Sequence, residues 1–372
     1  MKIAVNTRLL LKDRLEGIGW FTYETLKRIT KWHPEHQFYF IFDRVFSDEF
    51  VFETNVTPLI GYPQARHPYL WYFFFEYGIP YHLNKIKPDL FLSPDGWLSL
   101  RTDVKSVNVI HDLNFEHHPE FIKPNVQKYY NRYFHQFAQK ATRIATVSEF
   151  TKNDIHSLYQ ISLDNIDVVY NGCNLNFGPL SIEDQQQIKE QYTSGCDYFL
   201  FIGLIHKRKN LVNIFRAFDL FKTQSNSQVK LLIVGSKKWW QGEIEDTYLQ
   251  MQYKDDVIFM GHISSEELSQ VTASAIALIY TSLFEGFGIP ILEAFYAETA
   301  VITSNITSMP EVAGEAAILT NPYSVEEIAQ SLLLLYHNPK ERERLISKGR
   351  QQREKFNWDK TAKKLWQTIE KA

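Results

Sequence analysis

Two glutamates eight positions apart, Glu285 and Glu293, bracket the nearly apolar stretch FEGFGIPILEA (residues 284–294). The strand-like run IALIYTS (276–282) comes directly before it, so we expect Glu285 in a strand-to-helix loop. Pro290 suits the first turn of the helix that follows, and we expect Glu293 in that same turn. Carboxylates on each side of such a loop could bind the hydroxyls of a ribose or of a sugar.

The glycines of this loop point to a ligand as well. Gly286 and Gly288 allow the backbone to turn N–H groups toward a phosphate or a sugar hydroxyl. A simpler interpretation is that Glu293 only stabilises the positive end of the helix and that Glu285 is solvated. Three large apolar side chains argue against a merely solvated loop: Phe284, Phe287 and Ile289.

A basic motif follows an earlier strand-like run. The stretch GLIHKRKNL (203–211) ends the run YFLFIGLI (198–205) and opens a helical pattern. Arg208 and Lys209 could offset the charge of a diphosphate there, while the helix end adds N–H donors. The alternative is a solvated basic turn.

A glycine pair opens a helical pattern near the start of the chain, in EGIGWFTYETL (16–26). Gly17 and Gly19 do not form the dinucleotide fingerprint GxGxxG, because Thr22 occupies the third glycine position. An ordinary glycine-containing loop is the alternative interpretation.

His111 and Asp112 lie at the end of another strand-like run, in NVIHDLNFEHHP (108–119). A histidine there could bind a sugar hydroxyl or transfer a proton, or it could be a structural side chain with its hydrogen bonds satisfied. His111, His117 and His118 do not predict a metal site, since no fourth ligand or zinc-like spacing accompanies them.

Alternating strands and helices must position these residues. Strand-like runs in the first half are residues 2–6, 37–42, 89–93, 106–110, 143–148 and 166–171, and the series restarts with 198–205, 230–236, 257–262, 276–282, 300–304 and 316–320. Helical patterns at 19–30, 69–85, 125–140 and 149–159 lie between the first of them. Fully apolar strands alternating with helices predict two doubly wound α/β domains, which we place at residues 1–175 and 176–357. A closing helix at 358–372 is expected to pack back on the first domain.

Composition excludes several classes of protein. The net charge of −3, from 40 basic and 43 acidic residues, gives no reason to expect nucleic acid. Two cysteines without a CxxC pair indicate neither a disulfide framework nor structural zinc. With no signal peptide or membrane span evident, we expect a soluble protein of the cytoplasm, with the inner face of the membrane as a further option. The aromatic stretch 69–77 could serve a membrane surface or sugar stacking, or be a helix buried against a sheet.

Taken in order, the motifs resemble those of the family 4 glycosyltransferases, which have the GT-B fold. The resemblance spans nearly the whole chain, and the Glu-x₇-Glu element is its specific part. The supporting motifs are the glycine pair, His111-Asp112, TVSEFTKNDI (146–155), YNGCN (170–174), RKNL (208–211) and SMPEVAGEAA (308–317). The resemblance implies two Rossmann-like domains across a cleft, the first binding the acceptor and the second a nucleotide diphosphate sugar. It also implies retaining, metal-independent transfer of the sugar to an acceptor hydroxyl.

The family roles carry over to matching residues. Glu293 would bind the ribose hydroxyls, and Glu285 and His111 would contact the donor sugar as the catalytic residues. Lys209, with Arg208, would offset the diphosphate charge. The other donor-site positions are Gly17 and Gly19 from the first domain, the backbone of Gly286, Phe287, Gly288 and Ile289, and His262 and Ile263 beside the base.

The resemblance has one departure and limited detail. Many members carry arginine directly after the glycine that ends the first strand of the second domain, whereas Leu204 follows Gly203 here, and Arg208 would substitute. Because members with RKN include mannosyltransferases, GDP-mannose is the first expected donor, with UDP-sugars next. The expected acceptor is a glycan or lipid-linked oligosaccharide of a surface polysaccharide or lipopolysaccharide. No cofactor or metal is expected, because no Asp-x-Asp pair follows an apolar strand.

Two other functions remain compatible with this scaffold. One is a sugar-nucleotide epimerase, and the other is a subunit that binds a nucleotide sugar without turnover. The presence of Glu285, Glu293, Lys209 and His111 disfavours the second. An oxidoreductase ranks lower, because the glycine fingerprint fails at Thr22.

Overall fold

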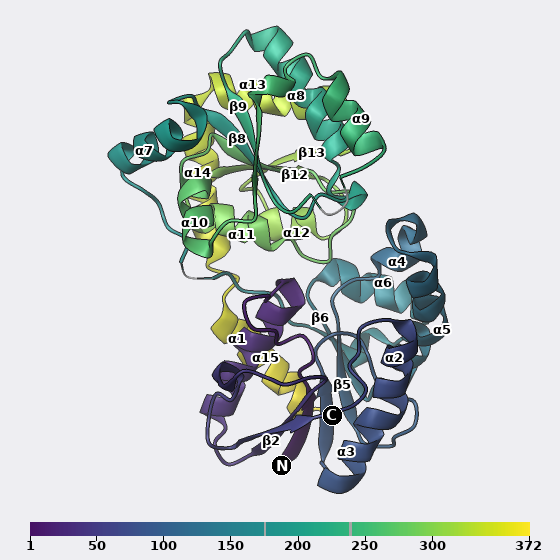
Figure 1. Cartoon of the computed structure of the whole chain (residues 1–372). Helices are drawn as coiled ribbons and strands as arrows, with labels where there is room; N and C mark the ends of the chain where they lie inside the picture. Colours follow the sequence, from purple (N-terminus) through teal and green to yellow (C-terminus); the bar gives the residue numbers. More distant parts are fainter. Residues whose placement is uncertain (175, 238–239) are drawn as a thin grey trace. The chain divides into compact units, whose positions relative to one another are not determined.

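The computed structural model describes residues 1–174, 176–237 and 240–372, and the chain divides into two compact units (Figure 1). Unit 1 comprises Met1–Gly172 and Asn357–Ala372, and unit 2 comprises Cys173–Phe356. The chain therefore passes from unit 1 to unit 2 between Gly172 and Cys173, a few residues before the expected boundary at 175/176. The chain returns to unit 1 at Asn357, which the sequence had assigned to the second domain.

A seven-stranded parallel sheet forms the centre of unit 1, with the order β3-β2-β1-β4-β5-β6-β7. Its core is apolar because the residues of its central strands β1, β4 and β5 are almost all buried, on both faces of the sheet. The strands are β1 (Lys2–Asn6), β2 (Gln37–Phe42), β3 (Val56–Ile60), β4 (Leu90–Ser93), β5 (Ser106–Ile110), β6 (Arg143–Thr146) and β7 (Ile166–Val168).

The sequence analysis missed β3 because Pro58 interrupts its strand pattern. Proline lacks an N–H group, so it is tolerated where one side of a strand has no partner. Pro58 meets that condition because β3 lies at the edge of the sheet and pairs with β2 alone.

Helices cover both faces of the unit 1 sheet (Figure 1). α1 and the C-terminal α15 pack together on one face, and the group α2, α3 and α5 covers the other. The expected helix 69–85 contains a π-helical turn, η2 (Phe74–Gly78), between α2 and α3. The helices are α1 (Gly17–Trp32), α2 (Pro68–Phe73), α3 (Ile79–Ile86), α4 (Asn114–His117), α5 (Pro124–Lys140), α6 (Glu149–Tyr159) and α15 (Trp358–Glu370), with 3₁₀ turns at Asp48–Phe50, Pro119–Phe121 and Leu163–Asn165.

Unit 2 has a six-stranded parallel sheet with the order β10-β9-β8-β11-β12-β13. Its strands are β8 (Tyr198–Ile202), β9 (Lys230–Val234), β10 (Val257–Gly261), β11 (Ala277–Tyr280), β12 (Ala300–Ser304) and β13 (Ile318–Thr320). Its helices are α7 (Ile182–Thr193), α8 (Leu211–Ser225), α9 (Glu243–Gln250), α10 (Ser265–Ala273), α11 (Ile289–Tyr296), α12 (Met309–Ala313), α13 (Val325–His337) and α14 (Pro339–Arg353), with 3₁₀ turns at Lys207–Lys209 (η5) and Lys254–Asp256. Near the boundary, α7 contains three consecutive glutamines, residues 185–187, and its first turn is capped by the Ser181 side chain.

The strand order reverses once in each sheet. In unit 1 the chain runs from β1 outward to β3 and then restarts on the other side of β1 with β4. In unit 2 it runs from β8 outward to β10 and restarts beside β8 with β11. Loops that leave two such neighbouring strands diverge, which makes their carboxyl ends the usual ligand site of a parallel sheet.

Candidate functional site

The basic motif of unit 2 follows β8, at the reversal point of the sheet. After Gly203, the chain forms η5 and then begins α8 at Leu211. Asn210 adopts a left-handed conformation (φ 62°) between them, and its side-chain amide donates to the carbonyl oxygens of Thr281 (3.0 Å) and Pro322 (2.7 Å). Asn210 thereby fixes Arg208 and Lys209 against the loops that follow β11 and β13.

Glu285 contacts both basic side chains of this motif. Its Oε2 accepts a hydrogen bond from Arg208 Nη1 and its Oε1 accepts one from Lys209 Nζ, each at 2.6 Å. Lys209 Nζ also donates to the hydroxyl of Tyr280 (2.8 Å), and Arg208 Nη1 to the carbonyl oxygen of Phe284 (3.0 Å). The neighbouring strands β8 and β11 thus bring together one carboxylate and two cations that are distant in the sequence.

The charges at Glu285 are strongly coupled. Burial alone would raise the pKa of Glu285, but the charges of Arg208 and Lys209 outweigh it and lower the pKa to about 2. The carboxylate is therefore ionised at neutral pH. With two cations against one anion, the cluster has a net positive charge and can attract a further anion.

Ser308 supports the loop between Glu285 and α11 through contacts with the loop backbone. The Ser308 hydroxyl is buried and contacts the carbonyl oxygens of Glu285 (2.8 Å) and Phe287 (3.1 Å). Gly288 caps α11 with φ 110°, a conformation that side-chain-bearing residues rarely adopt. The ring of Phe287 packs edge-on against Phe356. Because the ring is occupied in this way, Phe287 can offer a ligand mainly its backbone.

Glu293 differs from Glu285 in its surroundings. It is the fifth residue of α11, so the expectation that it lies in the first turn was wrong. Among the described residues, its carboxylate has no hydrogen bond or ion pair, and burial raises its pKa to about 7. A partly buried carboxyl group without a protein partner is costly to maintain, which makes it a candidate for contact with a ligand.

His111 follows β5 in unit 1 and is held by two neighbours. Its Nε2 lies 2.8 Å from the carbonyl oxygen of Pro94, so Nε2 carries the proton and donates it. The ring of Phe21 packs edge-on against it at 5.0 Å. Burial lowers the pKa of His111, although the Pro94 carbonyl and nearby acids oppose this. The neutral ring leaves Nδ1 as a hydrogen-bond acceptor.

The glycine pair of unit 1 has two different environments. α1 begins at Gly17, two residues before the predicted helical pattern 19–30, and a Cβ atom on Gly17 would meet no atom within 4 Å. A Cβ atom on Gly19 would lie 3.0 Å from the carbonyl oxygen of Leu9 and 3.2 Å from Leu15 Cδ2. Gly19 is therefore needed for close packing of α1 on the loop after β1, whatever it contacts in a ligand.

Sequence reasoning missed a polar cluster at the reversal point of unit 1. Arg8 follows β1 and Asp95 follows β4, and Arg8 Nε donates to Asp95 Oδ2 at 2.5 Å. The Arg8 side chain is 90% buried and its guanidinium lies 4.6 Å over the ring of Trp97. Asn6 and Ser93 also donate to Asp95 Oδ1. The signal for these residues is the same as for His111 and Asp112, namely polar residues directly after apolar strands.

Other sequence-predicted positions lie apart from these contacts. His262 is exposed and Ile263 is half-buried, both in the loop between β10 and α10. His117 pairs with Asp154 (2.7 Å) and His118 with Glu120 (3.1 Å).

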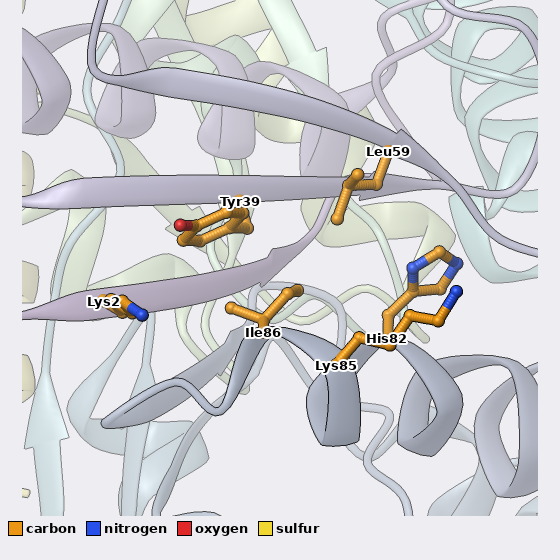
Figure 2. A pocket seen from close by; sticks show the side chains of 6 residues that line it. All are labelled: Lys2, Tyr39, Leu59, His82, Lys85 and Ile86. Carbon is orange, nitrogen blue, oxygen red and sulfur yellow. The ribbon is translucent and has the colours of Figure 1, made fainter.

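A cavity of about 270 Å³ lies in unit 1, and none of the predicted site residues lines it (Figure 2). Strands β1 to β3 and helix α3 form its walls. The lining side chains are Lys2, Tyr39, Leu59, His82, Lys85 and Ile86.

A group of possible metal ligands lies in the turn between α1 and β2. Ligand atoms of His33, Glu35 and His36 lie within 4.8 Å of one another. This turn precedes β2, so it lies at the amino end of the strand, away from the carboxyl ends where His111 and Arg8 lie. Ion pairing with Glu35 and stacking of both rings on Trp366 account for the arrangement.

Comparison with known proteins assigns both halves of the chain to one group of enzymes. Residues 16–177 match the family described as Glycosyltransferase Family 4, and residues 183–352 match Glycosyl transferases group 1. O-antigen chain mannosyltransferase B of Escherichia coli is 27% identical over 278 residues, which cover 74% of this chain and 73% of the relative. O-antigen chain mannosyltransferase RfbU of Salmonella typhimurium is 27% identical over 259 residues, 64% of this chain and 68% of the relative.

Solved structures resemble this chain over its full length. Anabaena HepE in complex with UDP and glucose has a TM-score of 0.75 at 15% identity, and each chain is covered completely. WaaG, a glycosyltransferase involved in lipopolysaccharide biosynthesis, has a TM-score of 0.75 at 14% identity over 98% of each chain. At this level of identity the likeness shows the fold.

Proposed function

The chain belongs to the family 4 glycosyltransferases, and on that premise we propose that it transfers mannose from GDP-mannose to a hydroxyl group of a glycan or lipid-linked acceptor. It is a glycosyltransferase with the two parallel-sheet units of the GT-B fold. The donor and acceptor follow from similarity to O-antigen mannosyltransferases and from the RKN motif. The product would be part of a polysaccharide or of lipopolysaccharide.

The observation that carries the proposal is the contact of Glu285 with Arg208 and Lys209 at the reversal point of unit 2. A departing nucleoside diphosphate develops negative charge, and fixed cations that are already in place stabilise it without reorganisation. The two cations exceed Glu285 in charge, so they can retain that contact and still meet the diphosphate. Because protein groups can supply this charge, we propose that transfer needs no metal ion or cofactor.

Glu293 is proposed to bind the ribose of the nucleotide. Its carboxyl group has no protein partner among the described residues, and two neighbouring ribose hydroxyls would supply the hydrogen bonds that it lacks. Backbone groups of Gly286 to Ile289, with His262 and Ile263 near the base, would complete the donor site.

His111 is proposed to accept a hydrogen bond from a hydroxyl of the donor sugar. The Pro94 carbonyl holds the proton on Nε2, which leaves Nδ1 to accept. Retention without a protein nucleophile is consistent with departure and attack on the same face of the sugar. The bond from the anomeric carbon to the phosphate oxygen breaks, the acceptor oxygen bonds to that carbon, and the acceptor proton passes to the leaving phosphate.

The acceptor is proposed to bind unit 1 near Arg8. This side chain lies at the reversal point of the sheet, and among the described residues no hydrogen bond involves its two terminal nitrogens. A guanidinium group over an aromatic ring, with free N–H groups, suits a phosphate or the hydroxyls of a sugar.

The direct test is to incubate the protein with GDP-mannose and UDP-sugars, with and without candidate glycan or lipid-linked acceptors. Release of GDP that requires acceptor, together with an α-linked product from the α-linked donor, would support the proposal. Isomerised donor without acceptor would favour the epimerase, and donor binding without any reaction would favour a binding subunit. Activity that is lost with a chelator and restored by manganese would contradict metal independence.

A further inference from the structure

Exposed aromatic side chains concentrate on one short stretch of unit 1. Seven Trp, Tyr or Phe side chains are exposed among residues 1–174, 176–237 and 240–372, and five of them lie within 62–81. Tyr69, at 78%, is the most exposed of all seven. The five are Tyr62, Tyr69, Phe73, Tyr77 and Tyr81. The expectation that residues 69–77 are simply buried against a sheet is therefore only half right.

The spacing of four of these residues places them along one side of the helical segment α2–η2–α3. Tyr69, Phe73, Tyr77 and Tyr81 are four residues apart, the spacing that stacks side chains on one helix face. The rings of Phe73 and Tyr77 lie 5.8 Å apart, which confirms that two of them adjoin. The opposite side packs into the core through Phe74, Phe75, Ile79 and Leu83. We call the exposed side the aromatic face.

Basic side chains surround the aromatic face. Arg101 lies 4.3 Å over the ring of Tyr77, and Lys85 lies 4.4 Å over the ring of Tyr81. Lys85 also lines the cavity beside α3, where its side chain lies close to His82 (Figure 2). α5 packs beside α2 and adds further basic residues (Figure 1).

The charge of this surface differs in sign from that of the chain as a whole. Segments 61–88 and 123–140 contain seven lysines and arginines and a single acidic residue, Glu76, which is buried. The acidic residues that flank these segments, Asp89, Asp103 and Glu120, are exposed, and Asp103 pairs with Lys140. Cations therefore outnumber acidic side chains here without excluding them. The whole chain has a net charge of −3, so the positive charge is a local feature.

We propose that the aromatic face and the basic residues around it bind the surface of an anionic lipid bilayer. Tyrosine and phenylalanine rings enter the headgroup region, while lysine and arginine side chains reach the lipid phosphates. A bare apolar face would equally suit a second protein chain, but segments with seven cations and one buried acid are complementary to a uniformly negative surface. Every described helix is too short or too polar to span a membrane, so the contact would be peripheral.

Vesicle co-sedimentation of the full chain tests this proposal without donor or acceptor. Wild-type protein should sediment with vesicles of phosphatidylcholine and phosphatidylglycerol and stay in solution with phosphatidylcholine alone. The triple variant Tyr69→Ser, Phe73→Ser, Tyr81→Ser should lower the partition coefficient about tenfold or more, because three interfacial rings are lost. The triple variant Lys85→Gln, Lys128→Gln, Arg132→Gln should lower it about fivefold per charge, or about a hundredfold.

Matched controls use exposed residues of unit 2. Leu249→Ser with Tyr323→Ser removes two exposed apolar side chains, and Lys254→Gln with Lys340→Gln removes two exposed lysines. Both controls should sediment like the wild type, and all variants should keep the circular dichroism spectrum and thermal midpoint of the wild type.

Several outcomes would overturn the proposal. They are wild-type protein that stays in solution with anionic vesicles, equal binding to neutral vesicles, aromatic-face variants that bind like the wild type, and controls that lose as much binding. A change from dimer to monomer in the aromatic-face variant, seen by light scattering without lipid, would assign the face to a second copy of the chain instead. Sugar transfer is not measured in this experiment, so its result is independent of the proposed reaction.

Discussion

The two glutamates of the proposed donor site have opposite electrostatic environments. Glu285 is compensated by two cations and has a pKa of about 2, whereas burial raises the pKa of Glu293 to about 7. The first is an anion at any physiological pH, and the second gains and loses its proton near neutrality. Of the two glutamates, only Glu293 should therefore make nucleotide binding depend on pH in that range.

Replacing Glu293 with Gln should weaken GDP binding about tenfold or more, because hydrogen bonds to a charged group contribute about 1.5–3 kcal/mol. In the wild type, affinity should rise as the pH is raised through about 7, since ribose hydroxyls donate to the ionised carboxylate. Calorimetric titrations of both proteins at a series of pH values test this. The terminal phosphate of GDP also titrates in this range, so the informative quantity is the difference between the two proteins, and identical pH profiles would refute the ribose contact.

The same substitution should affect stability in the opposite direction. A carboxyl group whose pKa is raised on folding favours the folded state below its unfolded pKa, and this contribution is lost as the pH rises toward about 7. A glutamine does not ionise, so Glu293→Gln avoids the destabilisation that the buried charge causes at high pH. Unit 2 of the variant should therefore be more stable than unit 2 of the wild type above pH 7 in thermal unfolding without ligand. A variant that is less stable at high pH would show that Glu293 has a structural role.

Arg8 allows a prediction about the acceptor. Arg8→Met keeps only the aliphatic part of the side chain and removes the guanidinium that lies over Trp97 and pairs with Asp95. The KM for the acceptor should rise about tenfold, by the loss of one charge-assisted hydrogen bond, while the Kd for GDP is unchanged. Steady-state kinetics with varied acceptor and a separate GDP titration measure the two effects. An equal loss in both would indicate general damage to the protein.

At the scale of elements, the loop after β11 is positioned by Ser308, the residue that precedes α12. Ser308 precedes α12 and holds the carbonyl oxygens of Glu285 and Phe287. Ser308 is the first residue of the motif SMPEVAGEAA, and in the structure it supports the loop after β11.

Ser308→Ala should reduce kcat and weaken GDP binding, because the single hydroxyl proton shared by two buried carbonyl groups is lost and the loop loses its support. The cost in stability should be about 1–3 kcal/mol. Ser304→Ala is the matched control: it removes an equally buried hydroxyl that contacts the Ser282 carbonyl at 2.6 Å, at the end of β12. It should cost similar stability and leave GDP affinity unchanged. If both variants bind GDP alike, the support of the loop by Ser308 has no functional effect.

Strands and helices were largely predictable, because short, continuously apolar runs indicate buried strands and apolar residues at helical spacing indicate the helices between them. β3 was not, since Pro58 conceals it, and the π turn within 69–85 was not, since it leaves the apolar pattern intact. Within the site, strand order was the missing information. Only the adjacency of β8 and β11 brings Lys209 to Glu285, and only that of β1 and β4 brings Arg8 to Asp95.

At the scale of the whole molecule, the C-terminal helix belongs to the unit in which the chain begins. α15 packs on α1 and is tied to it by Arg28 and Asp359 (2.6 Å), and Thr361 donates to the carbonyl oxygen of Tyr170. Trp366 stacks on His33 with ring centroids 3.7 Å apart. The buried side chains of α15 include Leu365 and Ile369, so this helix supplies part of the unit 1 core.

Removing residues 357–372 should therefore lower the unfolding temperature of unit 1 and leave unit 2 intact. The double variant Leu365→Ala, Ile369→Ala tests the same point at full length, since each buried truncation should cost about 2–5 kcal/mol. Scanning calorimetry with and without GDP distinguishes the units, because a ligand stabilises only the unit that binds it. The GDP-sensitive transition should stay at its wild-type temperature in both variants while the other transition falls. If the GDP-sensitive transition falls equally, α15 supports the nucleotide-binding unit as well, and the assignment of this helix to unit 1 alone is wrong.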